Sequence, residues 1–153
     1  MAAKASASKK VTLFKVRAAQ LKKGAFSYLP LLKTYLMSVR MMVYAEGGED
    51  DLHCHPGEEH AFIILNGEAV FSDGKGRKRA VRKYEGIFLP MGAFYTFKST
   101  GKENLVLLRI EAGPDGRRFG PDNKPLLYNP SRGYVAARMP VAIPGKFFGA
   151  VEA

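Results

Sequence analysis

The chain is poor in cysteine, has no long apolar run and carries no histidine outside one short stretch. The single cysteine, Cys54, excludes an internal disulfide and fits a reducing compartment. No apolar run approaches the roughly 18 residues of a membrane-spanning helix. The opening MAAKASASKK is polar and basic, without the apolar segment of a secretory signal. We therefore expect a cytoplasmic protein with no membrane partner.

Helical periodicity is also scarce, and no internal repeat is visible. The best helix candidate is short, residues 17–23, and ends at Gly24. Strand signals are stronger, and turn residues separate the candidate strands at short intervals. The candidate strands are TYLMSVRMMVY (34–44), HAFIIL (60–65), EAVFSD (68–73), GIFLP (86–90), AFYTFK (93–98) and NLVLLRIEA (104–112). This spacing predicts an all-β sandwich or barrel rather than alternating strands and helices.

The length of 153 residues suits a single domain. We expect a disordered N-terminal tail over residues 1–12 and a β-barrel over residues 13–112. From residue 113 onward prolines become frequent and alternating runs become rare. We therefore expect residues 113–153 to form an extended, proline-rich arm that packs on the barrel or on a partner subunit.

Positive charge dominates the chain, with a formal net charge of +10. The stretch GKGRKRAVRK (74–83) has six basic residues and no acidic one. A solvated hairpin is the favoured interpretation. A nucleic-acid partner is disfavoured, because the aromatic-and-glycine pattern of common RNA-binding sheets is missing. In a third interpretation the positive field attracts a small anionic substrate. A nucleic-acid patch would depend on Arg77, Lys78, Arg79, Arg82 and Lys83.

All three histidines fall within HCHPGEEHAFIILNGE, residues 53–68. In an extended backbone, His53 and His55 project from the same face, so both can reach one metal ion. His60 begins the next candidate strand, where it can complete the set, and Glu58 and Glu59 offer carboxylates beside it. Imidazole ligands favour iron, nickel, copper and zinc over magnesium and calcium. Metal binding is therefore favoured over the alternative that these are ordinary hydrogen-bonded or surface histidines.

The same stretch resembles the first conserved motif of the cupins, a family of small jelly-roll β-barrels. That motif reads G-x5-H-x-H-x3-4-E-x6-G. The matching residues are Gly47, His53, His55, His60 and Gly67, with His60 in the position usually held by glutamate. A competing alignment places Glu59 in that position and needs one more residue before the final glycine.

The stretch GIFLPMGAFYTFK resembles the second cupin motif, G-x5-P-x-G-x2-H-x3-N. It supplies Gly86, Pro90 and Gly92, with three residues rather than five between the first two, and Tyr95 stands at the histidine position. The resemblance covers roughly residues 35–111. It implies an all-β, single-domain jelly-roll barrel with little helix. It also implies a homodimer, because small barrels of this family commonly pair through exposed sheet edges.

The resemblance implies one divalent metal ion held by His53, His55, His60 and Tyr95. Iron(II), Fe2+, is favoured, with Zn2+, Ni2+, Mn2+ and Cu2+ as alternatives. Three neutral histidines leave the charge of the ion uncompensated, which favours an anionic ligand. Tyr95 either ligates the ion, hydrogen-bonds to a bound water or substrate, or only lines the barrel. Tyr95 and Glu59 are also the candidate catalytic acid or base.

A cupin interior is a cavity with the metal at one end and apolar walls, which suits a small organic ligand. Arg40 shares a strand face with Met42 and Tyr44. If that face is the lumen, Arg40 can clamp a carboxylate; otherwise it is a surface arginine. The candidate pocket residues are Arg40, Phe62, Ile64, Phe88 and Phe97.

Three classes of function stay open at this stage. The favoured class is a metal-dependent, dioxygenase-like oxidoreductase that acts on a small, anionic organic substrate. The second is an isomerase, lyase or hydrolase that works without oxygen. The third is a non-catalytic protein that binds a small ligand. The fold does not choose among them, because one fold hosts many chemistries.

Overall fold

A computed structural model of the chain describes residues 10–16, 19–23, 26–45, 48–126 and 141–148. These residues form strands, turns and extended segments, and none of them is helical. Accordingly, the described part of the chain contains no helix long and apolar enough to cross a membrane. The expectation of an all-β chain with little helix is confirmed for these residues.

The described residues contain eleven strands. They are β1 (Ala19–Lys23), β2 (Phe26–Lys33), β3 (Met37–Tyr44), β4 (Gly48–His53), β5 (Gly57–Asn66), β6 (Glu68–Asp73), β7 (Lys78–Arg82), β8 (Gly86–Leu89), β9 (Tyr95–Ser99), β10 (Leu105–Asp115) and β11 (Val141–Phe148).

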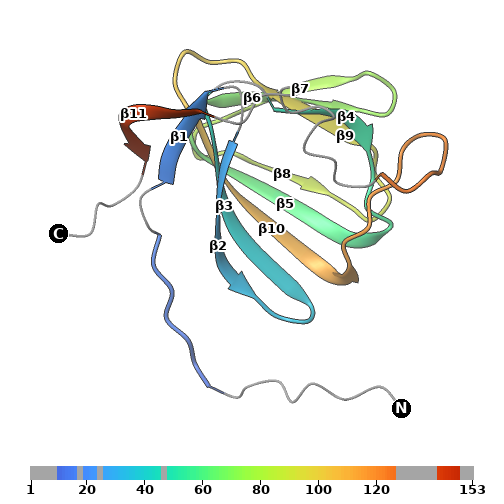
Figure 1. The fold of residues 1–153 in the computed structure, drawn as a ribbon. Coiled ribbons are helices and arrows are strands. Elements are labelled where there is room, and N and C mark those ends of the chain that lie inside the picture. Colours follow the sequence, from blue (N-terminus) through green and yellow to red (C-terminus); the bar gives the residue numbers. More distant parts are fainter. Residues whose placement is uncertain (1–9, 17–18, 24–25, 46–47, 127–140, 149–153) are drawn as a thin grey trace.

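Two antiparallel sheets form the barrel. A five-stranded sheet has the order β2-β3-β10-β5-β8, and a four-stranded sheet has the order β4-β9-β6-β7. The two sheets face each other across the core, while β1 and β11 form a separate two-stranded sheet at one end of the molecule (Figure 1). This is the predicted jelly-roll architecture.

The hairpin between β5 and β6 follows the sequence signal closely. Strand β6 has the predicted bounds, whereas β5 begins at Gly57, three residues before the predicted start. Gly67 connects the two strands with a φ of 76°. A Cβ atom at Gly67 would lie 2.7 Å from the backbone oxygen of Asn104. The turn therefore requires glycine for both its backbone angle and its close approach to the neighbouring chain.

The prediction of a helix over residues 17–23 is wrong for the part of it that the structure describes. Residues Ala19–Lys23 form strand β1, which pairs antiparallel with β11. Leu21 is buried and packs with Met41, Val43 and Val106 on the outer face of the five-stranded sheet. Pairing with a distant strand therefore satisfies the backbone of a segment whose local helical signal is weak.

The expected tail and arm are described only in part. Residues 1–9, 127–140 and 149–153 lie outside the described residues. The described end of the expected arm, β11, lies along β1 of the same chain. The boundaries at residues 12 and 113 stay predictions.

Inward-facing side chains form rows across the five-stranded sheet, because directly paired residues point to the same face. Three consecutive rows are Met42–Leu107–Ile64, Arg40–Arg109–Phe62 and Ser38–Glu111–His60. The first row belongs to the buried apolar core, which continues into the four-stranded sheet through Phe71, Tyr95 and Phe97. The lumen thus changes from apolar to charged along β10, and His60 lies at the charged end.

Candidate metal centre

The structure brings the three histidines and Tyr95 together. His53 ends β4, His55 follows it, and His60 lies in β5; all three are buried. Tyr95 begins β9 and is the direct pairing partner of His53. The distances between ring centroids are 5.2 Å for His53 and His55, 4.1 Å for His55 and His60, and 4.4 Å for His53 and Tyr95. The predicted residues therefore form one cluster at the charged end of the lumen.

Two hydrogen-bond contacts orient this cluster. The Nδ1 atom of His53 lies 2.7 Å from the backbone oxygen of Asp51, which accepts from Nδ1–H. That contact makes Nε2 the ring nitrogen with the lone pair, as in many metal-binding histidines. The Tyr95 hydroxyl lies 3.2 Å from Nδ1 of His60. In this arrangement Tyr95 is a hydrogen-bonding partner of a candidate ligand.

Glu58, and not Glu59, is the carboxylate that accompanies the histidines. Glu58 Oε2 lies 3.2 Å from His60 Nε2 and 3.9 Å from His55 Nδ1. Strand alternation places Glu58 and His60 on one face and Glu59 on the other, where it is exposed. The structure therefore does not bring Glu59, the expected acid or base and the alternative ligand, to the site.

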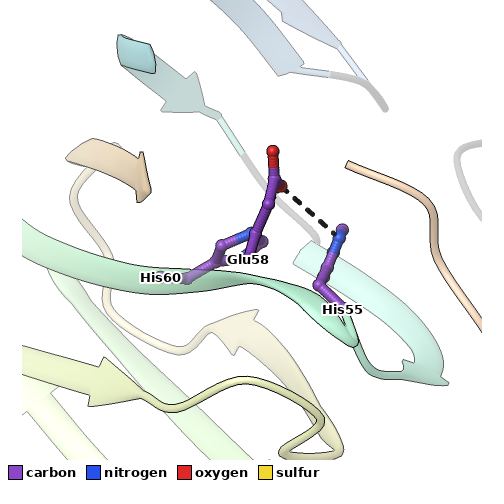
Figure 2. Close-up of side chains that lie close together, drawn as sticks. All are labelled: His55, Glu58 and His60. Carbon is purple, nitrogen blue, oxygen red and sulfur yellow. Dashed lines mark hydrogen bonds and ion pairs between the residues drawn. The ribbon is translucent and has the colours of Figure 1, made fainter. Parts of the chain in front are cut away.

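Three side chains form a group that can hold a metal ion. Ligand atoms of His55, Glu58 and His60 all lie within 4.8 Å of one another. Figure 2 shows His55 and Glu58 side by side, with His60 next to Glu58 on β5. Two histidines and one carboxylate are the donor set of many non-haem iron sites. His53 adds a third imidazole to the neighbourhood of this group.

The electrostatics of the site also fit a metal ion. Burial, followed by positive charge on neighbouring groups such as Arg109, lowers the pKa of both His55 and His60 to about 2. Both imidazoles are therefore neutral, which is the form that binds metal. Within the described residues, neither ring nitrogen of the buried His55 makes a hydrogen bond. Burial, and then the negative Glu111, raises the pKa of Glu58. A bound cation would compensate the partly buried Glu58 carboxylate and engage the His55 nitrogens.

A buried charge network adjoins the metal centre. Arg109 and Glu111 form an ion pair of 2.8 Å, and Arg40 pairs with the same carboxylate. The Ser38 hydroxyl donates a hydrogen bond to Glu111. Sequence reasoning missed Arg109 and Glu111. Alternation along NLVLLRIEA contained the signal, because it places both charges on the face of Leu105 and Leu107.

A cavity of about 480 Å³ lies beside this network, and His55 and Glu58 are part of its wall. Of the expected pocket residues, Arg40 lines this cavity. The other residues that line it are Phe26, Tyr28, Lys33, Thr34, Tyr35, Met37, Ser38, Met42, Arg109, Glu111, Gly113, Pro114, Gly116 and Arg118.

The four expected aromatic and aliphatic wall residues lie elsewhere. Phe62, Ile64 and Phe97 are fully buried in the apolar core rather than at the cavity. Phe88 is 58% exposed, because the alternation in β8 turns Ile87 and Leu89 toward the core instead. Phe88 is therefore not a wall residue, and the apolar side of the cavity comes from β2 and β3.

The basic stretch 74–83 contributes the turn and the second strand of the β6–β7 hairpin, as expected for a solvated hairpin. Residues Lys78–Arg82 form β7, and β7 pairs with β6. Two arginines of the basic stretch have acidic partners on β6: Arg77 pairs with Asp73 at 2.7 Å, and Arg82 pairs with Glu68 at 2.8 Å. Part of the positive charge is thereby compensated within the hairpin.

Comparisons with known proteins agree with this geometry. The sequence profile of the family described as Cupin domain matches residues 40–111. The structure resembles the cupin domain of Schizosaccharomyces pombe Cnp3, with a TM-score of 0.53 and 20% identity over 57% of this chain and 61% of that chain. Residues 40–111 of the chain thus match a cupin domain, and the structure has the cupin fold. No curated protein matches it in sequence.

Other structures share the cupin fold. A conserved protein of Klebsiella pneumoniae with a double-stranded β-helix domain gives a TM-score of 0.57 and 19% identity, over 62% of this chain and 78% of that one. A recombinant oxalate oxidase in complex with glycolate gives a TM-score of 0.52 and 16% identity, over 63% of this chain and 55% of that chain. This cupin thus spans less than two thirds of the Cnp3 and oxalate oxidase chains. At these identities the similarity concerns the fold.

Proposed function

We propose that this cupin binds one divalent metal ion, with iron(II) favoured, and acts as a dioxygenase-like enzyme on a small anionic organic compound. One observation carries the proposal: His55 and Glu58 belong both to the group that can hold a metal ion and to the wall of the cavity. A compound in that cavity therefore contacts the candidate ligands themselves.

The donor set supports iron among the possible metals. Two histidines and a carboxylate that leave coordination positions open are typical of non-haem iron(II) oxygenases. Iron(II), when bound, supplies redox chemistry with dioxygen. Zinc, nickel, manganese and copper accept the same donors.

Residues of the chain orient the candidate metal ligands and attract the anionic compound. The Asp51 carbonyl fixes the ring of His53, and the Tyr95 hydroxyl contacts the ring of His60. Basic side chains along the cavity wall attract an anion toward the site. An oxalate oxidase with the same fold is described in complex with glycolate. Small carboxylates are also the compounds that we propose for this cupin.

The test uses metal-free protein that is loaded with iron(II) in the absence of oxygen. Addition of nitric oxide, an oxygen analogue, is expected to give the electron paramagnetic resonance signal of a ferrous nitrosyl complex, with one iron per chain. His55→Ala is expected to lose both the iron and the signal. Absence of iron uptake, or bound iron that does not react with nitric oxide, would contradict the proposal.

An oxygen-independent isomerase or lyase is the second candidate, and it applies if Glu58 holds no metal: this carboxyl lines the cavity, and burial raises its pKa in the metal-free protein. A carboxyl group whose pKa lies above its ordinary value can take up and release a proton in the cavity. Oxygen-electrode and anaerobic assays with a panel of small carboxylates separate the two candidates. Oxygen consumption that requires both iron and carboxylate supports the dioxygenase, whereas conversion without oxygen supports the second candidate.

A further inference from the structure

The segment after β10 (orange in Figure 1) pairs with the chain between β4 and β5, where the isolated bridge joins Phe119 to Cys54. Cys54 and Phe119 pair through two backbone hydrogen bonds, each with an N–O distance of 3.0 Å. Cys54 lies between His53 and His55, so this bridge fixes the neighbouring Arg118 beside the metal centre. The Arg118 carbonyl also accepts a hydrogen bond of 2.8 Å from the Leu126 amide. The backbone of Arg118 is thus held on both sides.

The Arg118 side chain contributes positive charge to the cavity wall. It lines the cavity, and its Nε atom is buried with no hydrogen-bond partner among the described residues. Arg40 and Arg109 differ, because both pair with Glu111. The cavity wall holds four basic side chains and two acidic ones, so positive charge is in surplus; they are Lys33, Arg40, Arg109 and Arg118, with Glu58 and Glu111. A buried donor of this kind is stabilised when an anion accepts its hydrogen bonds.

Another part of the cavity wall is apolar and aromatic, and it includes Phe26, Tyr28 and Met42. Pairing between β2 and β3 places Tyr28 opposite Met42, one inward-facing row from Arg40, and Phe26 follows in the next row. The Arg40 guanidinium carbon lies 5.8 Å from the centre of the Tyr28 ring. The cavity of about 480 Å³ therefore has a cationic end at the metal centre and an apolar end along β2. Its volume is in the range of small-molecule pockets, roughly 300–1,000 Å³.

We propose that this cavity binds an amphipathic monocarboxylate, with its carboxylate on Arg118 and its aromatic or alkyl body against Phe26, Tyr28 and Met42. The proposal rests on the proposed function, because it names the substrate class of the same site. Arg118 is the residue that recognises the charge, and the β2 wall selects for an apolar body. A compound held in this way has its carboxyl end close to His55 and Glu58.

The probes are phenylacetate, its neutral analogue phenylacetamide, and acetate, which lacks the apolar body. Isothermal titration calorimetry with metal-loaded protein is expected to show that phenylacetate binds at least about tenfold more tightly than either of the others. The amide lacks the charge-assisted hydrogen bond to Arg118, and acetate lacks the contacts of an apolar body with the β2 wall. Arg118→Gln is expected to lower the affinity for phenylacetate by a similar factor and to leave the affinity for phenylacetamide unchanged. Arg118→Lys is expected to retain part of the affinity.

The neighbouring Arg117 provides the matched control. Its side chain is 71% exposed and pairs with Asp115 at 2.5 Å. Arg117→Gln is therefore expected to bind phenylacetate like the wild type. Thermal unfolding of each variant, together with its metal content, distinguishes loss of recognition from loss of the fold.

Two results would overturn the inference: equal affinity for phenylacetate and phenylacetamide, or an Arg118→Gln variant with unchanged phenylacetate binding. Neither result would contradict the proposed metal centre. Conversely, protein that discriminates the acid from the amide but takes up no metal supports the cavity and overturns the proposed function.

Discussion

Arg109 and Glu111 form an almost fully buried ion pair inside the barrel, with 2.8 Å between Nε and Oε1 and side-chain exposures of 8% and 5%. The same carboxylate pairs with Arg40 and accepts a hydrogen bond from Ser38. Burial alone raises the pKa of Glu111, but Arg109, Ser38 and Arg40 outweigh it and hold the pKa below its ordinary value. One carboxylate therefore stabilises the charged end of the lumen.

Replacement of this carboxylate is expected to destabilise the fold strongly. Glu111→Gln leaves two guanidinium groups without their counter-ion, and breaking a buried pair typically costs about 3–5 kcal/mol. Glu68→Gln is the control, because it removes an ion pair with the exposed Arg82 and should cost less than about 1 kcal/mol. Urea unfolding of both variants measures the difference. Equal losses of unfolding free energy would show that burial of the Glu111 pair is unimportant.

Metal-free protein is expected to lose stability as the pH falls from neutral toward about 5. Burial and nearby cations lower the pKa of His55 and His60 to about 2, whereas histidines in an unfolded chain titrate near 6.5. Below about pH 6.5 the unfolded state thus binds more protons, so the stability contributed by these neutral imidazoles is complete above that pH and is lost below it. Each contributes a slope of up to about 1.4 kcal/mol per pH unit.

Urea unfolding in the presence of a chelator, at several pH values between 5 and 7, tests this dependence. His60→Gln is expected to flatten the slope. Glu58 acts with the opposite sign, because a raised pKa contributes stability at low pH that is lost as the pH rises. Glu58→Gln is therefore expected to steepen the slope. A wild-type protein with constant stability over this pH range would contradict the prediction.

Two of the three phenylalanines that sequence reasoning placed on the cavity wall, Phe97 and Phe88, are expected to differ in their contribution to stability. Phe97 is fully buried and stacks on Phe71 with 5.0 Å between ring centroids. Phe97→Ala should cost about 3–5 kcal/mol. Phe88 is exposed, so Phe88→Ala should stay within about 0.5 kcal/mol of the wild type. Thermal or urea unfolding of both variants measures the difference. A large loss of unfolding free energy for Phe88→Ala would contradict the prediction and place the Phe88 ring in an interface or a cavity.

Local patterns predicted most of the barrel because the strands alternate and their turns have clear signals. The segment EAVFSD became β6 with the predicted bounds. The histidine cluster was also predictable, since three imidazoles occur within eight residues. The same alternation could have selected Glu58 over Glu59, because Glu58 lies two residues before His60. The family motif directed attention to Glu59 instead.

Long-range pairing supplied what the sequence could not predict. Strand β1 depends on β11, whose residues lie at the other end of the chain. Arg118 reaches the metal centre only because Phe119 pairs with Cys54. No local periodicity marks either contact, since both arise from backbone hydrogen bonds between distant segments. The cavity wall was missed for a related reason: β2 was not predicted as a strand.

The metal content of purified protein tests the central claim most directly. Wild-type protein that is dialysed against iron(II) without oxygen, or against zinc, should hold one ion per chain by elemental analysis. Glu58→Gln should weaken metal binding by at least about tenfold. Loss of a residue that only hydrogen-bonds to a metal ligand already lowers metal affinity by that factor. Glu59→Gln, one residue away on the exposed face, should bind like the wild type, and His55→Ala should hold no ion. A wild-type protein without metal, or equal effects of the two glutamine substitutions, would contradict the account.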